Sequence, residues 1–223
     1  MTRVVAIDGP AGAGKSTIAR SLARDLGVPY LDTGAMYRAV TYAVLRDGLD
    51  PRDQQAVVAL ANRIRVEVDA ETIAVDGHDI TAHIREVDVT QAVSFVAAIS
   101  GVRNLMRDQQ RNWVSAHGGG VVEGRDIGTV VFPDATLKVF LTASPRVRAE
   151  RRVAQAGGDV EEIARMIAER DHLDSTRADS PLVATKDYVV VDTSDMDIAT
   201  VVQRLIDLVH HNEIQHNKGA SNE

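Results

Sequence analysis

The chain has 223 residues, of which 44% are hydrophobic and 26% are charged, and its formal net charge is −7. This length holds one α/β domain with an insertion, or two small domains at most. The negative charge argues against nucleic-acid binding, and the absence of cysteine excludes disulfides and thiolate metal sites. No apolar run approaches the ~20 residues of a membrane span, so we expect a cytoplasmic protein with neither a nucleic acid nor a membrane as partner.

The first predicted strand, residues 4–7, leads directly into a phosphate-binding loop. The loop reads GPAGAGKS and is followed by a helical run from Thr17 to Leu26. Its glycines let main-chain N–H groups surround a polyphosphate, and the helix N-terminus adds further donors. Lys15 is placed to reach the β- and γ-phosphates, and the Ser16 hydroxyl is a hard ligand for Mg²⁺. The predicted ATP-binding residues are Gly9, Pro10, Ala11, Gly12, Ala13, Gly14, Lys15, Ser16 and Thr17.

Four more apolar, β-branched runs alternate with helical patterns along the chain. They cover residues 28–32, 121–123, 137–141 and 188–191. Runs of this kind predict a parallel sheet with helices on both faces, so the fold class is α/β with five parallel strands. Polar residues follow each run at its carboxyl end, which is the edge where such sheets bind ligands.

The hydrophobic pattern changes to a period of two near residue 63, where Ile64, Val66 and Val68 share one face. Asp76-Gly77 then favours a hairpin turn. We predict a small antiparallel insertion over residues 63–95, a core over 1–62 and 96–210, and a disordered tail over 211–223. The insertion is expected to extend to a helical segment that starts near Thr90. A hairpin without any role in ligand binding is the alternative interpretation of the insertion.

Arginines recur where a second phosphorylated ligand could bind. Arg38 follows Thr33, the predicted N-cap of the helix after the second strand. Ser144-Pro145 predicts another helix start, and the arginines behind it share one face, where they repel each other unless an anion lies between them. These arginines are Arg148, Arg151 and Arg152. A solvated basic face is the alternative interpretation.

The next helix carries a stripe that is apolar in its first half and charged in its second. Its members are Val160, Ile163, Ile167, Arg170, Asp174 and Arg177. Charges on a face that packs onto the core must be paired or bound to a ligand. Arg125-Asp126 is a further pair between glycines at a strand end. Structural ion pairs remain the alternative interpretation in both places.

In this order, the segments GPAGAGKST, LDTGAMYR, VVEGRDIGTVVFPDA and ERDHLDSTRADSPL resemble bacterial cytidylate kinases, a family of P-loop nucleoside monophosphate kinases. The resemblance runs from the first strand to about residue 208. It implies transfer of the ATP γ-phosphoryl group to CMP or dCMP with Mg²⁺ as cofactor. It also implies that the insertion binds the monophosphate and that a short helical lid lies over about residues 146–170.

The resemblance assigns site residues one by one. It places the cytosine against Thr33, Arg103, Asp126 and Arg177, and the sugar near Ser94, Arg170 and Asp174. It gives the acceptor phosphate to Arg38 and Arg125, and the charge stabilisation in catalysis to Lys15, Arg148, Arg151 and Arg152. Relatives often have Ser at position 33, and some have Gly at position 16, so Thr17 could share the Mg²⁺ with Ser16.

Two other functions stay open on the sequence. One is a P-loop kinase with another acceptor, such as UMP, AMP or shikimate. The other is a regulatory module that hydrolyses ATP slowly, although no Asp in the chain has Gly three residues later, as a GTPase switch would require. We expect a monomer, because no long apolar stripe remains once the core helices are assigned.

Overall fold

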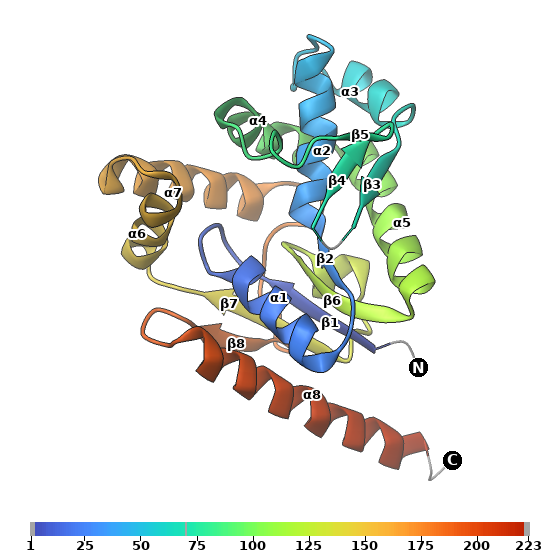
Figure 1. Ribbon diagram of the computed structural model, residues 1–223, viewed down its shortest axis with the longest axis vertical. Coiled ribbons are helices and arrows are strands. Elements are labelled where there is room, and N and C mark those ends of the chain that lie inside the picture. The colour runs from blue at the N-terminus through green and yellow to red at the C-terminus, as the bar shows by residue number, and fades with distance from the viewer. Residues whose placement is uncertain (1–2, 70, 221–223) are drawn as a thin grey trace.

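The computed structural model describes residues 3–69 and 71–220, which are built around a five-stranded parallel sheet (Figure 1). The strand order is β2 (Tyr30–Asp32), β6 (Gly119–Gly124), β1 (Arg3–Asp8), β7 (Leu137–Thr142) and β8 (Val189–Asp192). The central strand β1 pairs in parallel with β6 and with β7. The prediction of five parallel strands between helices is confirmed.

Helices cover both faces of this sheet, because alternate side chains of each buried strand point to opposite sides. Helices α1 (Lys15–Leu26) and α8 (Ile198–Ala220) cover one face, where Ile7, Leu22 and Leu205 are buried. Helices α2 (Thr33–Arg46) and α5 (Ser100–His117), with the short π-helix η1 (Ile127–Val131), cover the other. The glycines and polar residues at the carboxyl ends of β1, β2 and β6 therefore meet at one edge.

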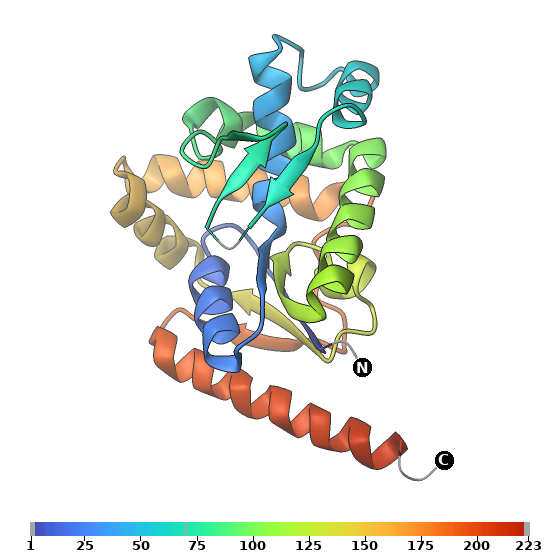
Figure 2. The ribbon, with the colours of Figure 1, turned by 45° about the vertical axis from the view of Figure 1, so that its right-hand side comes forward.

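The predicted insertion is an antiparallel sheet of β3 (Val66–Val68), β4 (Ile73–Val75) and β5 (His78–Asp79). The turn between β4 and β5 is Asp76-Gly77, with φ values of 52° and 78°, as a two-residue hairpin requires. Helices α3 (Gln54–Ala61) and α4 (Val87–Ala98) flank it. Both helices and the strands β3 and β4 pack against α2, on the side of the molecule away from the main sheet (Figures 1 and 2). The indole N–H of Trp113 on α5 donates to Val68 O at 3.3 Å, which ties β3 to the core.

Helices α6 (Pro145–Ala156) and α7 (Val160–Thr176) pack against each other beside the carboxyl edge of the sheet (Figure 1). The predicted start of α6 is confirmed, since the Ser144 hydroxyl accepts a hydrogen bond from Val147 N. Gly157 and Gly158, both with positive φ, make the turn to α7, whose N-cap is Asp159. Helix α7 also packs against α4, so it spans from the sheet edge to the insertion.

Three local predictions need correction. The N-cap of α2 is Asp32, which accepts from Ala35 N at 3.0 Å, and Thr33 is the first helical residue. The chain leaves β2 at Asp32 with an extended backbone, so the preceding carboxylate caps the helix in place of the threonine. Helix α8 continues to Ala220, whereas we expected disorder from residue 211; residues 221–223 lie outside the described part. Helix α4 begins at Val87, three residues before the expected start.

No helix in the described part of the chain combines the length and the hydropathy that a membrane crossing needs. Over residues 3–69 and 71–220, the apolar side chains instead form two clusters, one on each face of the sheet.

Close packing between α3 and α5 holds the helix that carries Arg103. A Cβ atom added at Gly101 would lie 2.6 Å from Val58 Cγ2. We expect Gly101→Ala to lower the free energy of unfolding by about 1–3 kcal/mol in denaturant titrations, because the branched valine cannot move away. Ser115→Ala on the exposed side of α5 is the control, and Val58→Ala should restore part of the loss. Unchanged stability of Gly101→Ala would contradict this packing.

Candidate active site

The loop between β1 and α1 has a backbone that only glycine accommodates at three positions. Gly9, Gly12 and Gly14 have φ values of 150°, 77° and 85°. A Cβ atom at Gly9 would lie 2.0 Å from Leu141 O, and Gly14 is the left-handed N-cap of α1. The loop therefore lies directly on β7 and leads into the N-terminus of α1, where unpaired N–H groups favour an anion.

Lys15 lies inside this loop. Its Nζ donates to Gly9 O and Pro10 O, both at 2.8 Å, and the residue is 7% exposed. Burial, with Arg125 nearby, lowers the pKa of the Lys15 ammonium group. A polyanion in the loop would favour the charged form, so the lysine is placed to respond to phosphate.

Glu123 at the end of β6 is a site residue that our sequence analysis did not identify. It is 3% exposed and accepts a hydrogen bond from the Tyr30 hydroxyl, and it also interacts with Ser16. Burial and the nearby Asp32 raise the pKa of Glu123. An acid at the end of the apolar run over residues 121–123 was the signal that could have identified it.

The donor set around Ser16 fits Mg²⁺. Ser16 is half-buried beside the Glu123 carboxylate, whereas Thr17 is exposed, so Ser16 is the better-placed ligand. No group of three or more His, Cys, Asp or Glu residues suitable for a metal occurs in the described part of the chain. One hydroxyl with a nearby carboxylate suits an ion whose other ligands are phosphates and water.

Arg170 lies near Arg38 and near Arg125, and both Arg125 and Arg170 lie near Lys15. Burial, followed by repulsion from Arg170, lowers the pKa of Arg38 to about 9. Burial, followed by repulsion from Arg125, lowers the pKa of Arg170 to about 10. Arg125 and Arg170 also lower the pKa of Lys15. The structure thus brings these predicted residues together as one cationic cluster, in which Asp174 is hydrogen-bonded to Arg125.

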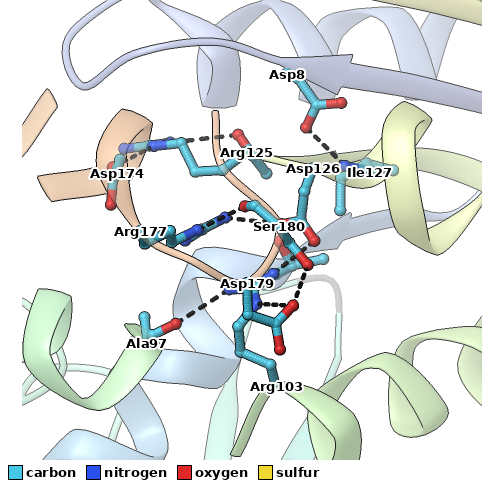
Figure 3. A network of polar contacts seen from close by, with 12 residues as sticks. Asp8, Ala97, Arg103, Arg125, Asp126, Ile127, Asp174, Arg177, Asp179 and Ser180 are labelled. Atoms are coloured by element: carbon cyan, nitrogen blue, oxygen red, sulfur yellow. Dashed lines mark hydrogen bonds and ion pairs between the residues drawn. The ribbon is translucent and has the colours of Figure 1, made fainter. Parts of the chain in front are cut away.

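Hydrogen bonds hold two of these arginines in place. Arg38 Nη1 donates to Ile84 O at 3.0 Å and to Thr90 Oγ1 at 2.8 Å, at the start of α4. Arg125 Nε donates to Asp174 Oδ2 at 2.7 Å (Figure 3). Arg170 Nε is buried without a hydrogen-bond partner in the described part of the chain. Buried guanidinium groups left partly unpaired are costly, which favours binding of an anion here.

A second network joins Arg103, Asp126 and Arg177. Arg103 is 1% exposed, and its Nη2 donates to Asp126 Oδ2 at 2.5 Å and its Nη1 to Ala97 O at 3.1 Å. Arg177 Nη2 donates to the other carboxylate oxygen of Asp126 at 3.3 Å, and its Nε to Ser180 O at 2.6 Å. Figure 3 shows both guanidinium groups directed at this carboxylate. The network presents fixed donors beside an acceptor, as recognition of a polar ring requires.

Asp8, the last residue of β1, fixes the segment that follows Asp126. Its two carboxylate oxygens accept from Ile127 N and Gly128 N, both at 2.9 Å, and from the Tyr188 hydroxyl at 2.6 Å. Burial raises the pKa of Asp8 although these donors oppose the rise. The bonds cap the start of η1, and π-helical turns occur frequently at functional sites. Asp8 was not predicted, because its partners lie more than a hundred residues away.

The three predicted arginines of α6 have different partners. Arg148 contacts Ala11 O at 3.0 Å, and Arg151 donates to Thr193 O at 2.6 Å. Arg152 lies near Arg38 and Arg170. Burial is the main cause of the lowered pKa of both groups, and the positive charge of Arg152 adds to it.

The last two predicted residues, Thr33 and Ser94, carry hydroxyl groups on α2 and α4. The Thr33 hydroxyl donates to Glu123 O at 2.7 Å. Ser94 is half-buried on α4, and it has no hydrogen bond to the other site residues in the described part.

The hydrogen bonds that Asp8 accepts from Ile127 N, Gly128 N and the Tyr188 hydroxyl should stabilise the fold. We expect Asp8→Asn to lower the free energy of unfolding by about 1–3 kcal/mol, because the amide nitrogen cannot accept the bonds that the carboxylate accepts. Tyr188→Phe removes one donor and should cost about 1 kcal/mol. Urea denaturation measures both free energies. If Asp8→Asn were as stable as the wild type, Asp8 would not have this stabilising role.

Comparisons with known proteins agree with this geometry. The family model described as Cytidylate kinase matches residues 5–211. The cytidylate kinase of Mycobacterium leprae (strain Br4923) is 53% identical over 211 residues, which cover 92% of this chain and 95% of that protein. The cytidylate kinase of Mycobacterium avium (strain 104) is 52% identical over 215 residues, which cover 92% and 94%. The crystal structure of a gluconokinase from Sinorhizobium meliloti 1021 superposes with a TM-score of 0.53 at 15% identity, covering 97% of both chains, and supports the fold alone.

Proposed function

The chain belongs to the cytidylate kinase family and phosphorylates CMP and dCMP, and on this premise we propose how its residues hold the two nucleotides. The observation that carries the proposal is the cluster of Arg38, Arg170, Arg125 and Lys15, in which each cation lies near the next. These cations oppose one another's charge, and an anion placed among them relieves the repulsion.

The triphosphate of ATP binds in the loop from Gly9 to Thr17. The main-chain N–H groups of the loop and the α1 N-terminus surround the phosphates, and Lys15 moves from its carbonyl partners to the β- and γ-oxygens. Ser16 would hold Mg²⁺, with Glu123 orienting the hydroxyl. When bound, Mg²⁺ neutralises charge that develops on the phosphate oxygens.

The monophosphate of CMP binds to Arg38, Arg125 and Arg170. Its cytosine ring meets the network of Arg103, Asp126 and Arg177, and its sugar lies near Ser94 and Asp174. Asp126 accepts from the exocyclic amine of cytosine, while the guanidinium groups donate to the ring nitrogen and carbonyl oxygen. Thr33 supports this pocket from the start of α2. Uracil offers a carbonyl in place of the amine, so it leaves the carboxylate without a donor.

Transfer needs positioning and charge stabilisation more than it needs a base. The acceptor phosphate is already ionised at neutral pH, so the residues need only hold it in line with the γ-phosphoryl group. Lys15 and the arginines of α6, namely Arg148, Arg151 and Arg152, stabilise the charge that develops on the transferred group. The helices α6 and α7 and the insertion surround the two phosphate sites and exclude water, which competes as an acceptor.

An acceptor panel tests the assignment. ADP release is measured with CMP, dCMP, UMP, AMP and shikimate at equal concentrations. We expect CMP and dCMP to give the highest kcat/KM values. A higher value with any other acceptor would refute the substrate assignment. ATP turnover that does not depend on any acceptor would favour the regulatory module instead.

Two single substitutions test the phosphate-binding roles. We expect Lys15→Ala and Arg125→Ala to keep the circular dichroism spectrum of the fold and to lower kcat by about 10²- to 10³-fold, as removal of an electrostatic contact to the transition state does. Arg24→Ala, in the exposed last turn of α1, is the matched control and should leave kcat unchanged. Turnover close to wild type at saturating substrates would remove that residue from its role.

The predicted cytoplasmic location and the monomeric state stay predictions. Size-exclusion chromatography with light scattering measures the mass in solution, and we expect that of one 24.1 kDa chain.

A further inference from the structure

Helix α7 carries two neighbouring charged residues with different partners. Arg170 belongs to the cationic cluster on the acceptor side, whereas Asp171 contacts the phosphate loop. Asp171 falls outside the stripe from Val160 to Arg177 that the sequence analysis identified, and the proposed function gives it no role.

The Asp171 carboxylate binds the phosphate loop and α6 at the same time. Its Oδ1 accepts from Ala11 N at 3.1 Å, and its Oδ2 accepts from Arg148 Nη1. The side chain is 19% exposed, and that of Arg148 is 9% exposed. An ion pair that is largely shielded from solvent is screened less than a surface pair, so it can fix the geometry of both partners.

Arg148 closes a ring with Asp171 and Ala11. The Nη1 atom that binds Asp171 also donates to Ala11 O at 3.0 Å, so both polar main-chain groups of Ala11 are used. Arg148 Nε donates to Ala143 O at 3.1 Å. At the next loop residue, a Cβ atom added to Gly12 would lie 3.0 Å from Arg148 Cβ. The ring of Ala11, Arg148 and Asp171 therefore joins the N-terminal part of the phosphate loop to both α6 and α7.

This ring holds a flexible side chain in one orientation. Among the described residues, the hydrogen bonds of Arg148 use Nε and Nη1, which leaves Nη2 for a ligand. An arginine that is already oriented loses less side-chain entropy when it binds phosphate. We propose that Asp171 is a positioning residue for the ATP side of the site: it orients Arg148 and fixes Ala11 in the phosphate loop. This inference rests on the proposed function, in which that loop binds ATP.

Two other roles for Asp171 make different predictions. If the carboxylate only anchored α7, its loss would also disturb Arg170 and Asp174 on the same helix and would weaken CMP binding. If it occupied Arg148 in competition with phosphate, its loss would strengthen ATP binding. A positioning role weakens the ATP side alone.

Asp171→Asn separates these roles, because the amide keeps the shape and one acceptor oxygen but removes the charge. We expect kcat/KM for ATP to fall by about 10- to 100-fold, as loss of a charged hydrogen bond does. The KM for CMP at saturating ATP should stay within about twofold, since Arg125 and Asp174 keep their bond. Isothermal titration with AMP-PNP should show a weaker Kd in the absence of CMP.

Glu169→Gln is the matched control, because Glu169 is an exposed carboxylate two residues away on α7. Its kinetics should equal those of the wild type. A lower KM for ATP in Asp171→Asn, equal rises in KM for both substrates, unchanged kinetics, or a variant that no longer folds would each overturn the inference. A wild-type enzyme that ignores CMP but binds AMP-PNP would instead refute the proposed function.

Discussion

Repulsion among buried cations is the constraint on which the candidate site depends. Lys15, Arg38 and Arg170 lie on α1, α2 and α7, and Arg125 follows β6. Burial, followed by repulsion within this cluster, lowers the pKa of Lys15, Arg38 and Arg170. Such an arrangement is unfavourable without an anion, so the fold must supply the stability that the site lacks. It does so through two apolar clusters on the faces of the parallel sheet. The charge that destabilises this part of the fold is the charge that, in our proposal, binds the phosphates of two nucleotides.

Carboxylates divide this cationic region into parts with separate tasks. Asp174 pairs with Arg125 on the acceptor side, Asp126 bridges Arg103 and Arg177 at the proposed cytosine pocket, and Asp171 pairs with Arg148 at the phosphate loop. Asp8 shows how the parts are aligned, because its bonds to Ile127 N and Gly128 N connect the strand before the phosphate loop to the turn after Asp126. One carboxylate thus connects the proposed donor site to the proposed acceptor site.

The sequence predicted most of the fold because the signals are local. Five apolar runs mark the strands, and the glycines of the phosphate loop mark the ATP side. The roles of Asp8, Glu123 and Asp171 were not predicted, because their partners lie far away in the chain: Ala11 and Asp171 are 160 positions apart. The cap of α2 was misplaced because Asp32 and Thr33 are both good N-cap residues. The helical continuation over 211–220 lacks the apolar periodicity from which helices are predicted.

Trp113 is the chain's single tryptophan, and its indole binds the first strand of the insertion. Its ring also stacks on His117 at a centroid distance of 4.0 Å, one turn further along α5. Indole emission depends on hydrogen bonding and on nearby quenching groups. Trp113 is therefore an intrinsic fluorophore at the contact between the core and the insertion. A change in its fluorescence would report a movement of the insertion in the native chain, without an attached dye.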